Sequence, residues 1–256
     1  MNGELLSISV IIPSPEYSED MPVLSSLSKT NYPDEKVEII IATGNHPSAQ
    51  RNKGAKAAKG DILYFFNNDS QTVPDLFLKA SEIFSGDANI AGIGGPDLTP
   101  VSNNYLQHLF GYAMTSYFAH WKMRARYSEI GEKRTAGEKE LLLSNLAVRK
   151  DVFLKADSFN ERLYPNEENE LINRIIEMGY KFIYAPEIRI YRDRRKDLPG
   201  FIKQFYKYGQ GRMNQISIEG FSGNLPFLIP VLLSVYLLVL PFIYNFPAAF
   251  VPLFLY

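Results

Sequence analysis

Three apolar runs mark the first third of the chain. Residues 8–12 (ISVII), 37–42 (VEIIIA) and 62–66 (ILYFF) consist almost entirely of hydrophobic side chains. Such runs are typical of parallel strands that are covered on both faces. The intervening segments 20–29 and 48–59 are long enough for crossover helices. The pattern therefore predicts a βαβαβ unit with right-handed connections.

The following residues are expected to continue this alternation. We predict helices at 74–84, 151–156, 166–178 and 198–208, and strands at 90–95, 141–148 and 181–184. Pro74 suits the first turn of a helix, and Gly179 suits a helix end. The fold class predicted from these elements is α/β, with a mainly parallel sheet flanked by helices.

The carboxyl-terminal segment has a different pattern. Residues 225–244, LPFLIPVLLSVYLLVLPFIY, hold twenty residues without a charge, which is about the length that crosses a bilayer core of ~30 Å. After Asn245 and Pro247 the apolar stretch AAFVPLFLY follows, and we expect it to begin a second, truncated span or to form a short re-entrant hairpin. The predicted domains are thus a globular domain, 1–220, and a transmembrane or membrane-inserted segment, 221–256. A buried core helix is the alternative.

Charge and composition indicate the compartment. Basic residues crowd the segment before the apolar stretch, which favours the cytoplasmic side of a membrane: Arg189, Arg192, Arg194, Arg195, Lys196, Lys203, Lys207 and Arg212. The amino terminus carries no secretory signal, so residues 1–220 are expected in the cytoplasm. The net charge of −1 gives no overall positive charge that would indicate nucleic-acid binding. The absence of cysteine excludes disulfides, thiol catalysis and cysteine-ligated zinc.

Residues 105–121 combine an apolar and aromatic helical stripe with a basic end. This mixture fits a helix that lies in a membrane interface. A helix that faces the core and has a solvated basic end fits equally well.

The third apolar run ends in a cluster of short polar side chains. In GDILYFFNNDS, residues 60–70, the run passes directly into Asn67, Asn68 and Asp69. Asp69 would therefore lie at the carboxyl end of a strand, where open α/β sheets bind their ligands. The alternative is a simple turn, because Asn and Asp are common in turns.

A second acidic cluster opens the helix predicted at 166–178. It contains Glu167, Glu168 and Glu170. A carboxylate at this place can deprotonate a hydroxyl group. The alternative is that the three side chains only stabilise the positive end of the helix dipole.

Residues 60–70 and 144–192 strongly resemble family 2 glycosyltransferases of the GT-A fold. Asn67-Asn68-Asp69 stands at the DxD motif, as in rhamnosyltransferase-like members, and residues 208–212 (YGQGR) resemble the YGxGR of exopolysaccharide transferases of the succinoglycan type. The resemblance, over about residues 7–212, implies a Rossmann-like mixed sheet. It also implies that Asp69 holds Mg²⁺ or Mn²⁺ on the donor diphosphate, although Asn67 is a weaker ligand than Asp. Glu168 is the implied catalytic base, and Glu167 is the fallback.

Other positions match the family's donor site: Pro13, Ser14, Glu16, Thr43, Arg51, Asn52, Asn67, Asn68, Arg192 and Arg212. Thr43 stands where members usually have an Asp that contacts the uracil or ribose, so the base is left open. Arg192 stands at the place of a His that faces metal or phosphate, and its guanidinium could contact the diphosphate directly. An exposed helix start at Arg51 and a helix end at Arg212 are the plain alternatives.

The resemblance implies an inverting, membrane-anchored glycosyltransferase at the cytoplasmic face of the cell membrane. Its partners would be a nucleotide-sugar donor, a lipid-linked or polysaccharide acceptor, and membrane lipid. Asn67, Thr43 and Glu168 depart from the usual family pattern. The alternative is therefore a GT-A-like protein without catalytic activity that serves as a binding or scaffolding subunit. A nucleotidyltransferase is disfavoured, because residues 14–17 (SPEY) contain no glycine for a phosphate loop.

Overall fold

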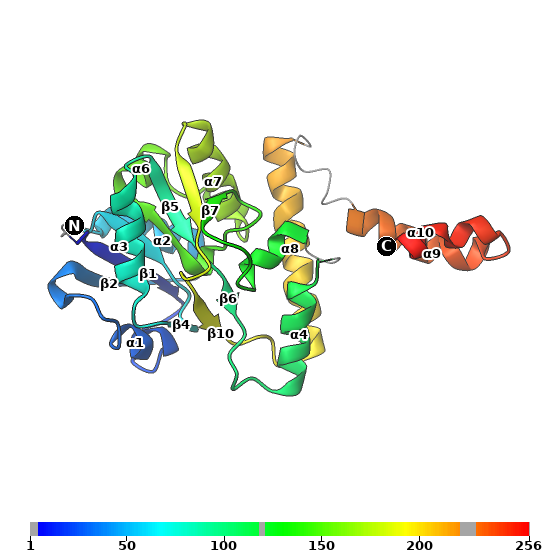
Figure 1. The fold of residues 1–256 in the computed structure, drawn as a ribbon, viewed down its shortest axis with the longest axis horizontal. Coiled ribbons are helices and arrows are strands. Elements are labelled where there is room, and N and C mark those ends of the chain that lie inside the picture. Colours follow the sequence, from blue (N-terminus) through cyan, green and yellow to red (C-terminus); the bar gives the residue numbers. More distant parts are fainter. Residues whose placement is uncertain (1–4, 118–120, 221–228, 256) are drawn as a thin grey trace. The chain divides into compact units, whose positions relative to one another are not determined.

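The computed structural model describes residues 5–117, 121–220 and 229–255. The chain forms two compact units, Met1–Tyr208 and Gly209–Tyr256. Figure 1 shows the helices and strands of both units along the chain. The first unit contains the central sheet and the residues singled out at its edge.

The central sheet has seven strands in the order β2-β1-β3-β8-β5-β9-β7. β1 is parallel to both β2 and β3, and β5 is parallel to β9, whereas β8 is antiparallel to β3 and β5, and β7 is antiparallel to β9. This mixed, largely parallel sheet confirms the predicted fold class. Its strands are β1 Ile8–Ser14, β2 Val37–Thr43, β3 Ile62–Phe65, β5 Ile90–Gly94, β7 Arg134–Ala136, β8 Leu146–Arg149 and β9 Lys181–Tyr184.

A second, three-stranded sheet was not predicted. Its order is β4-β10-β6, with β4 Ser70–Thr72 antiparallel to β10 Ile190–Arg192, and β10 parallel to β6 Asp97–Leu98. These strands are short and largely polar, so they have no apolar run that could reveal them. They place Arg192 opposite Ser70 and Ile190 opposite Asp97, and so bring distant charged residues to one edge.

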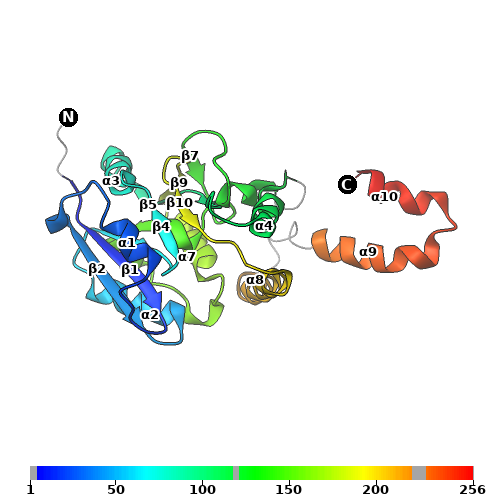
Figure 2. The same ribbon diagram turned by 90° about the horizontal axis from the view of Figure 1, so that it is seen from below.

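Helices cover both faces of the central sheet (Figure 2). On one face Tyr64 of β3 packs against Phe77, with ring centroids 5.7 Å apart. On the other face its neighbour Phe65 packs against Phe153 at 5.4 Å. Burial on both faces explains the continuous apolar run of β3. The helices of these two layers are α1 Pro22–Leu27, α2 Pro47–Ala57, α3 Leu76–Gly86, α6 Lys150–Lys155 and α7 Glu167–Glu177.

The expected strand at 141–148 is only partly correct. Its middle contains the short helix η3, Leu143–Asn145, and only its last three residues belong to β8. Asn145 accounts for the break, because its buried side chain accepts a hydrogen bond from Tyr64 Oη at 2.9 Å and donates to the carbonyl of Ile188 at 2.8 Å. These bonds fix Asn145 between the two sheets. The remaining short helices are η1 Asp34–Lys36, η2 Trp121–Arg126 and η4 Glu161–Leu163.

The helix α4, Tyr105–Thr115, is shorter than the predicted stripe, and residues 118–120 lie outside the described residues. Phe110 is buried and stacks on Phe201 with ring centroids 4.1 Å apart, whereas Leu106 and Leu109 are exposed. Phe201 belongs to α8, Leu198–Glu219, which continues eleven residues beyond the predicted end at 208.

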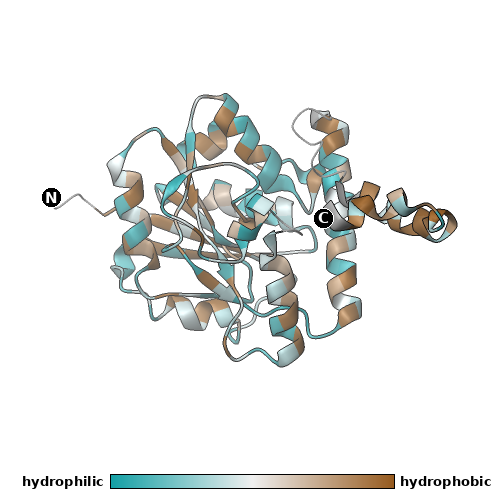
Figure 3. Ribbon diagram, turned by 45° about the vertical axis from the view of Figure 1, so that its right-hand side comes forward, coloured by the Kyte–Doolittle hydropathy of each residue, from teal (hydrophilic) through white to brown (hydrophobic). Residues whose placement is uncertain are grey.

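The second unit contains α9 Ile229–Ile243, η6 Pro247–Phe250 and α10 Val251–Leu255. Figure 3 shows that these elements are mainly hydrophobic. Tyr236 Oη donates a hydrogen bond to the carbonyl of Ala249 at 2.6 Å, which ties α9 to η6.

The structure describes the predicted membrane span at 225–244 only in part. Its first residues, 225–228, lie outside the described residues, and the described helix in this range is α9, which holds 15 residues. Among the residues that the structure describes, no helix is both long and apolar enough to cross a bilayer.

Candidate active site

Three strands of the central sheet, β1, β2 and β3, end at the edge where Asn67, Asn68 and Asp69 lie. Ser14 and Thr43, the last residues of β1 and β2, lie opposite each other in register. Asn68, which follows β3, has its side-chain nitrogen 3.5 Å from Ser14 Oγ. The structure thus brings together Ser14, Thr43 and Asn68, next to the buried Pro13, while Glu16 is exposed in the segment after β1.

Asp69 forms an ion pair that the sequence alone did not indicate. Arg192 Nε donates to Asp69 Oδ1 at 2.8 Å, and Arg192 Nη1 lies 3.7 Å from Asp97 Oδ2. The pairing of β10 with β4 and β6 fixes this arrangement. Burial lowers the pKa of the Arg192 guanidinium, but the charges of Asp69 and Asp97 outweigh it and hold the pKa above its ordinary value. Arg192 therefore stays protonated.

Asp97 is buried beneath Arg192. Burial raises the pKa of its carboxyl group, and the charges of Arg194 and Arg192 oppose that rise. Arg194 Nη1 lies 3.4 Å from Asp97 Oδ1, and Arg194 Nη2 donates to the backbone carbonyl of Asp97. Sequence reasoning missed Asp97, since its only signal is its place just after the apolar run of β5.

Arg51 connects the two acidic clusters. From α2 it donates through Nη1 to Glu167 Oε1 at 2.9 Å and through Nη2 to Asn67 Oδ1 at 3.0 Å. Both Arg51 and Glu167 are almost fully buried. Burial lowers the pKa of Arg51, and the negative charges of Glu167 and Glu168 counteract this effect. The tip after β3 and the start of α7 are therefore parts of one site.

Glu168 differs from its neighbour Glu167. It is 7% exposed at the first turn of α7. Burial, reinforced by the charge of Glu167, raises the pKa of Glu168 to about 7, although Arg126 and Arg51 oppose the shift. A carboxyl group with a pKa near neutrality can accept a proton and release it again at physiological pH.

Arg126 is a further site residue that sequence reasoning missed. Its guanidinium donates to Asn169 Oδ1 at 2.7 Å and to the backbone carbonyl of Glu138. This places a fixed positive charge near Glu168. In the sequence Arg126 belongs to a basic run after α4, and nothing in that run indicates a contact with α7.

Two of the predicted donor-site residues have other partners. Asn52 exchanges hydrogen bonds with the backbone of Phe159 and donates to Glu161 Oε1 at 3.0 Å. Arg212 belongs to the second unit and donates to Gln215 on the same helix. Roles of Asn52 and Arg212 toward a donor stay predictions.

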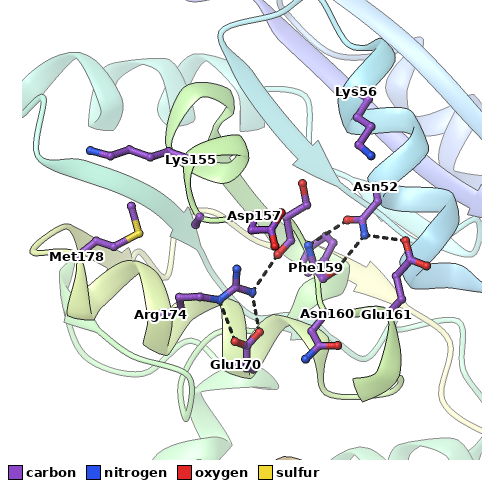
Figure 4. A pocket seen from close by; sticks show the side chains of 12 residues that line it. Asn52, Lys56, Lys155, Asp157, Phe159, Asn160, Glu161, Glu170, Arg174 and Met178 are labelled. Atoms are coloured by element: carbon purple, nitrogen blue, oxygen red, sulfur yellow. Dashed lines mark hydrogen bonds and ion pairs between the residues drawn. The ribbon is translucent and has the colours of Figure 1, made fainter.

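Asn52 also borders a cavity of about 700 Å³ between α2, α6 and α7 (Figure 4). Figure 4 shows Arg174 held by Glu170 on one side of this cavity, and Asn52 with Glu161 on another. Neither Asp69 nor Glu168 lines it. The cavity is therefore separate from the charged residues described above.

Arginines engage part of the oxygens at the tip that a divalent cation could bind. The described residues contain no group of three or more His, Cys, Asp or Glu side chains that could hold such a cation, so a cation here would take the rest of its oxygen ligands from a bound diphosphate or from water. Asn67 Oδ1 accepts from Arg51, and Asp69 Oδ1 accepts from Arg192. Mg²⁺ or Mn²⁺ at Asp69 stays a prediction from sequence.

Comparison with known proteins identifies the family. Residues 62–256 match the family model described as glycosyl transferase family group 2, and the chain belongs to this family. No curated protein matches the chain.

Several solved structures share its GT-A-like fold. A mannosyltransferase of Pyrobaculum calidifontis, PcManGT, in complex with GDP-Man and Mn2+, is 14% identical with a TM-score of 0.56, over 83% of this chain and 64% of that chain. GalNAc-T7 with UDP, GalNAc and Mn2+ is 14% identical with a TM-score of 0.52, over 74% and 44%. TarS residues 1–349 of S. aureus is 14% identical with a TM-score of 0.52, over 73% and 60%. This chain thus spans less than two thirds of each.

Proposed function

We propose that this chain is an inverting glycosyltransferase that moves a sugar from a nucleotide-sugar donor to a hydroxyl group of a lipid-linked or polysaccharide acceptor. The observation that carries the proposal is the buried Glu168, whose pKa is raised to about 7 at a site that also contains three fixed guanidinium groups. Family membership and the donors named for PcManGT and GalNAc-T7 support a nucleotide-sugar donor.

The proposed reaction is a single displacement. The acceptor oxygen forms a bond to the anomeric carbon, while the bond from that carbon to the diphosphate oxygen breaks. The nucleoside diphosphate leaves with the electron pair of the broken bond, and Glu168 takes the acceptor's proton. Such a base must be deprotonated before transfer, and a pKa near the working pH makes this possible.

The two neighbours of Glu168 have supporting roles in this proposal. Glu167 is held by Arg51 and also accepts a hydrogen bond from the backbone N–H of Asn166 at 3.0 Å. With both oxygens engaged, Glu167 orders the start of α7 and is less suited to receive a proton. The strand ends at Ser14 and Thr43 would face the nucleoside, because ligands of α/β sheets bind at this edge.

An assay with a panel of UDP-, GDP- and dTDP-sugars tests the proposal. We expect release of the nucleoside diphosphate from one of them, faster with an acceptor than without it. The product should carry the anomeric configuration opposite to that of the donor, which proton NMR measures. Retention of configuration would contradict the displacement. Nucleotide binding without either transfer or hydrolysis would favour the non-catalytic binding subunit instead.

We also propose that the second unit attaches the protein to the cytoplasmic face of the cell membrane. The described part of α9 carries no charge, and large apolar side chains such as Leu238 and Phe242 are exposed on it. In the first unit, Leu106 and Leu109 of α4 are also exposed. Apolar helices that expose such side chains bind readily to the apolar part of a bilayer.

Flotation with vesicles that contain anionic phospholipid tests this attachment. The double variant Leu238→Asp and Phe242→Asp should float far less than the wild type, because charges are costly inside a bilayer. The matched control is Val101→Asp, which changes a 91% exposed residue of the first unit. Equal flotation of the double variant and the control would contradict the attachment through α9.

A further inference from the structure

Two arginines of the segment after β9 contact the same buried carboxylate, but they do so differently. Arg194 uses all three guanidinium nitrogens: Nε donates to Thr99 Oγ1 at 2.9 Å, and the two Nη groups contact Asp97. Its side chain is only 5% exposed. Arg194 therefore neutralises Asp97, and its burial leaves it poorly accessible to a ligand.

Arg192 is the arginine that a ligand can reach. Its side chain is 20% exposed, and its hydrogen bond to Asp69 uses Nε. Nη1 is 3.7 Å from Asp97, and within the described part of the chain neither Nη group makes a hydrogen bond. A guanidinium with its Nη donors available is well suited to bind two phosphate oxygens side by side.

The same contacts disfavour a metal ion at this place. A divalent cation bound to Asp69 would lie beside the Arg192 guanidinium, whose positive charge would repel it. One oxygen of Asp69 and the side-chain oxygen of Asn67 already accept hydrogen bonds from arginines. Protonated Arg192 thus already supplies a positive charge at Asp69 Oδ1.

We propose that Arg192 neutralises the donor diphosphate in place of a divalent cation, so that donor binding and transfer by this chain do not depend on metal. This inference rests on the proposed glycosyltransferase function. The Nη groups of Arg192 donate hydrogen bonds to diphosphate oxygens, and Asp69 holds the guanidinium in position through Nε. When the bond to the anomeric carbon breaks, the electron pair stays on the phosphate oxygen. Arg192 keeps its protons throughout.

Calorimetry on the full wild-type chain provides the first test. The probes are UDP, GDP and dTDP, each titrated with EDTA, with Mg²⁺ or with Mn²⁺. We expect at least one of these nucleotides to bind, and its affinity to be the same in all three conditions. A gain of roughly tenfold or more with either metal would overturn the inference and leave the proposed function intact. If no nucleotide bound in any condition, the proposed function itself would fail, and the inference with it.

Three variants provide the second test. Arg192→Gln should weaken nucleotide binding about 10- to 100-fold, the scale of a lost charge-assisted hydrogen bond. Arg192→His should bind weakly in EDTA and regain affinity with Mn²⁺, because an imidazole beside Asp69 adds a metal ligand. The control is Arg195→Gln, whose arginine is exposed and donates a hydrogen bond to Gln204 Oε1. Thermal unfolding checks that all variants are folded.

The outcomes of this comparison are distinct. If Mn²⁺ raises the nucleotide affinity of Arg192→His but not that of the wild type, this would support the proposal that the Arg192 guanidinium takes the place of a metal ion. Equal nucleotide affinities of Arg192→Gln and Arg195→Gln would overturn the role of Arg192.

Discussion

The tip after β3 and the start of α7 present carboxyl groups to the same site under different conditions. Asp69 at the tip has a side chain that is 44% exposed and paired with Arg192. Glu168 at the start of α7 is buried, and its pKa is raised to about 7. The same functional group is thus an ion-pair partner at one place and, at the other, a buried acid whose pKa is raised. The surroundings, more than the residue type, set the role.

Arg51 makes the two regions one unit, because it contacts Asn67 at the tip and Glu167 on α7. The two adjacent glutamates at the start of α7 therefore differ. Glu167 accepts a hydrogen bond from Arg51, whereas the charges of Arg126 and Arg51 oppose the rise in the pKa of Glu168 that burial and Glu167 cause. This difference predicts which substitutions matter most.

The largest effect on stability is expected when the link between the regions is removed. Arg51→Met leaves the buried Glu167 without its cation, and breaking a buried ion pair in this way costs about 3–5 kcal/mol. Urea unfolding of the variant measures the loss. The control is Arg189→Met, which removes an exposed pair with Glu129 and should cost at most ~1 kcal/mol. Similar losses in the two variants would show that the ion pair of Arg51 with Glu167 stabilises the fold no more than an exposed ion pair does.

The next effect concerns the pH dependence of stability. In the folded chain the pKa of Glu168 lies at about 7, above its ordinary 4.5, so the folded state binds this proton more tightly than the unfolded state. Its contribution to stability is therefore fully present below pH 4.5 and is lost as the pH rises through 7. The loss amounts to about 3 kcal/mol.

Glu168→Gln removes this titration. Between about pH 5 and about pH 8 the free energy of unfolding of the variant should therefore rise relative to that of the wild type, by up to ~3 kcal/mol. Urea unfolding at several pH values measures the difference. Parallel curves for the two proteins would mean that Glu168 is not the group with the raised pKa.

The smallest effect on stability is expected at the tip. Asp69→Asn removes a partly exposed ion pair, so it should change the free energy of unfolding by less than ~1 kcal/mol. Asp97→Asn should cost clearly more, because Asp97 is buried between Arg192 and Arg194. Chemical unfolding of both variants gives the comparison. A large loss of unfolding free energy in Asp69→Asn would show that the ion pair at the tip contributes as much to stability as the buried pair at the start of α7.

The sequence predicted most of the central sheet, because β1, β2 and β3 are continuous apolar runs whose burial on both faces leaves a clear pattern. The sheet of β4, β6 and β10 was not predicted. Each of these strands has only two or three residues and depends on pairing with segments that are remote in the sequence. The helix predicted at 198–208 also ended too early, because α8 continues through Gly209 and Gly211 to Glu219.

The candidate site was predictable to the extent that its residues follow strands or open a helix. Asp69, Glu167 and Glu168 satisfy this condition and lie in one site through Arg51. Asp97 and Arg126 could not be predicted, because their roles come from contacts between segments that are remote in the sequence. The ion pair of Arg192 with Asp69 depends in the same way on the unpredicted strand β10.

Transfer kinetics of Glu168→Gln and Glu167→Gln test whether Glu168 is the base, with Glu177→Gln at the exposed end of α7 as the control. We expect Glu168→Gln to lower the transfer rate by roughly 10²-fold or more, with donor affinity nearly unchanged, and Glu167→Gln to lower it much less. The wild-type rate should rise with pH through about 7. Near-normal turnover of Glu168→Gln together with a collapse in Glu167→Gln would contradict the assignment of the base.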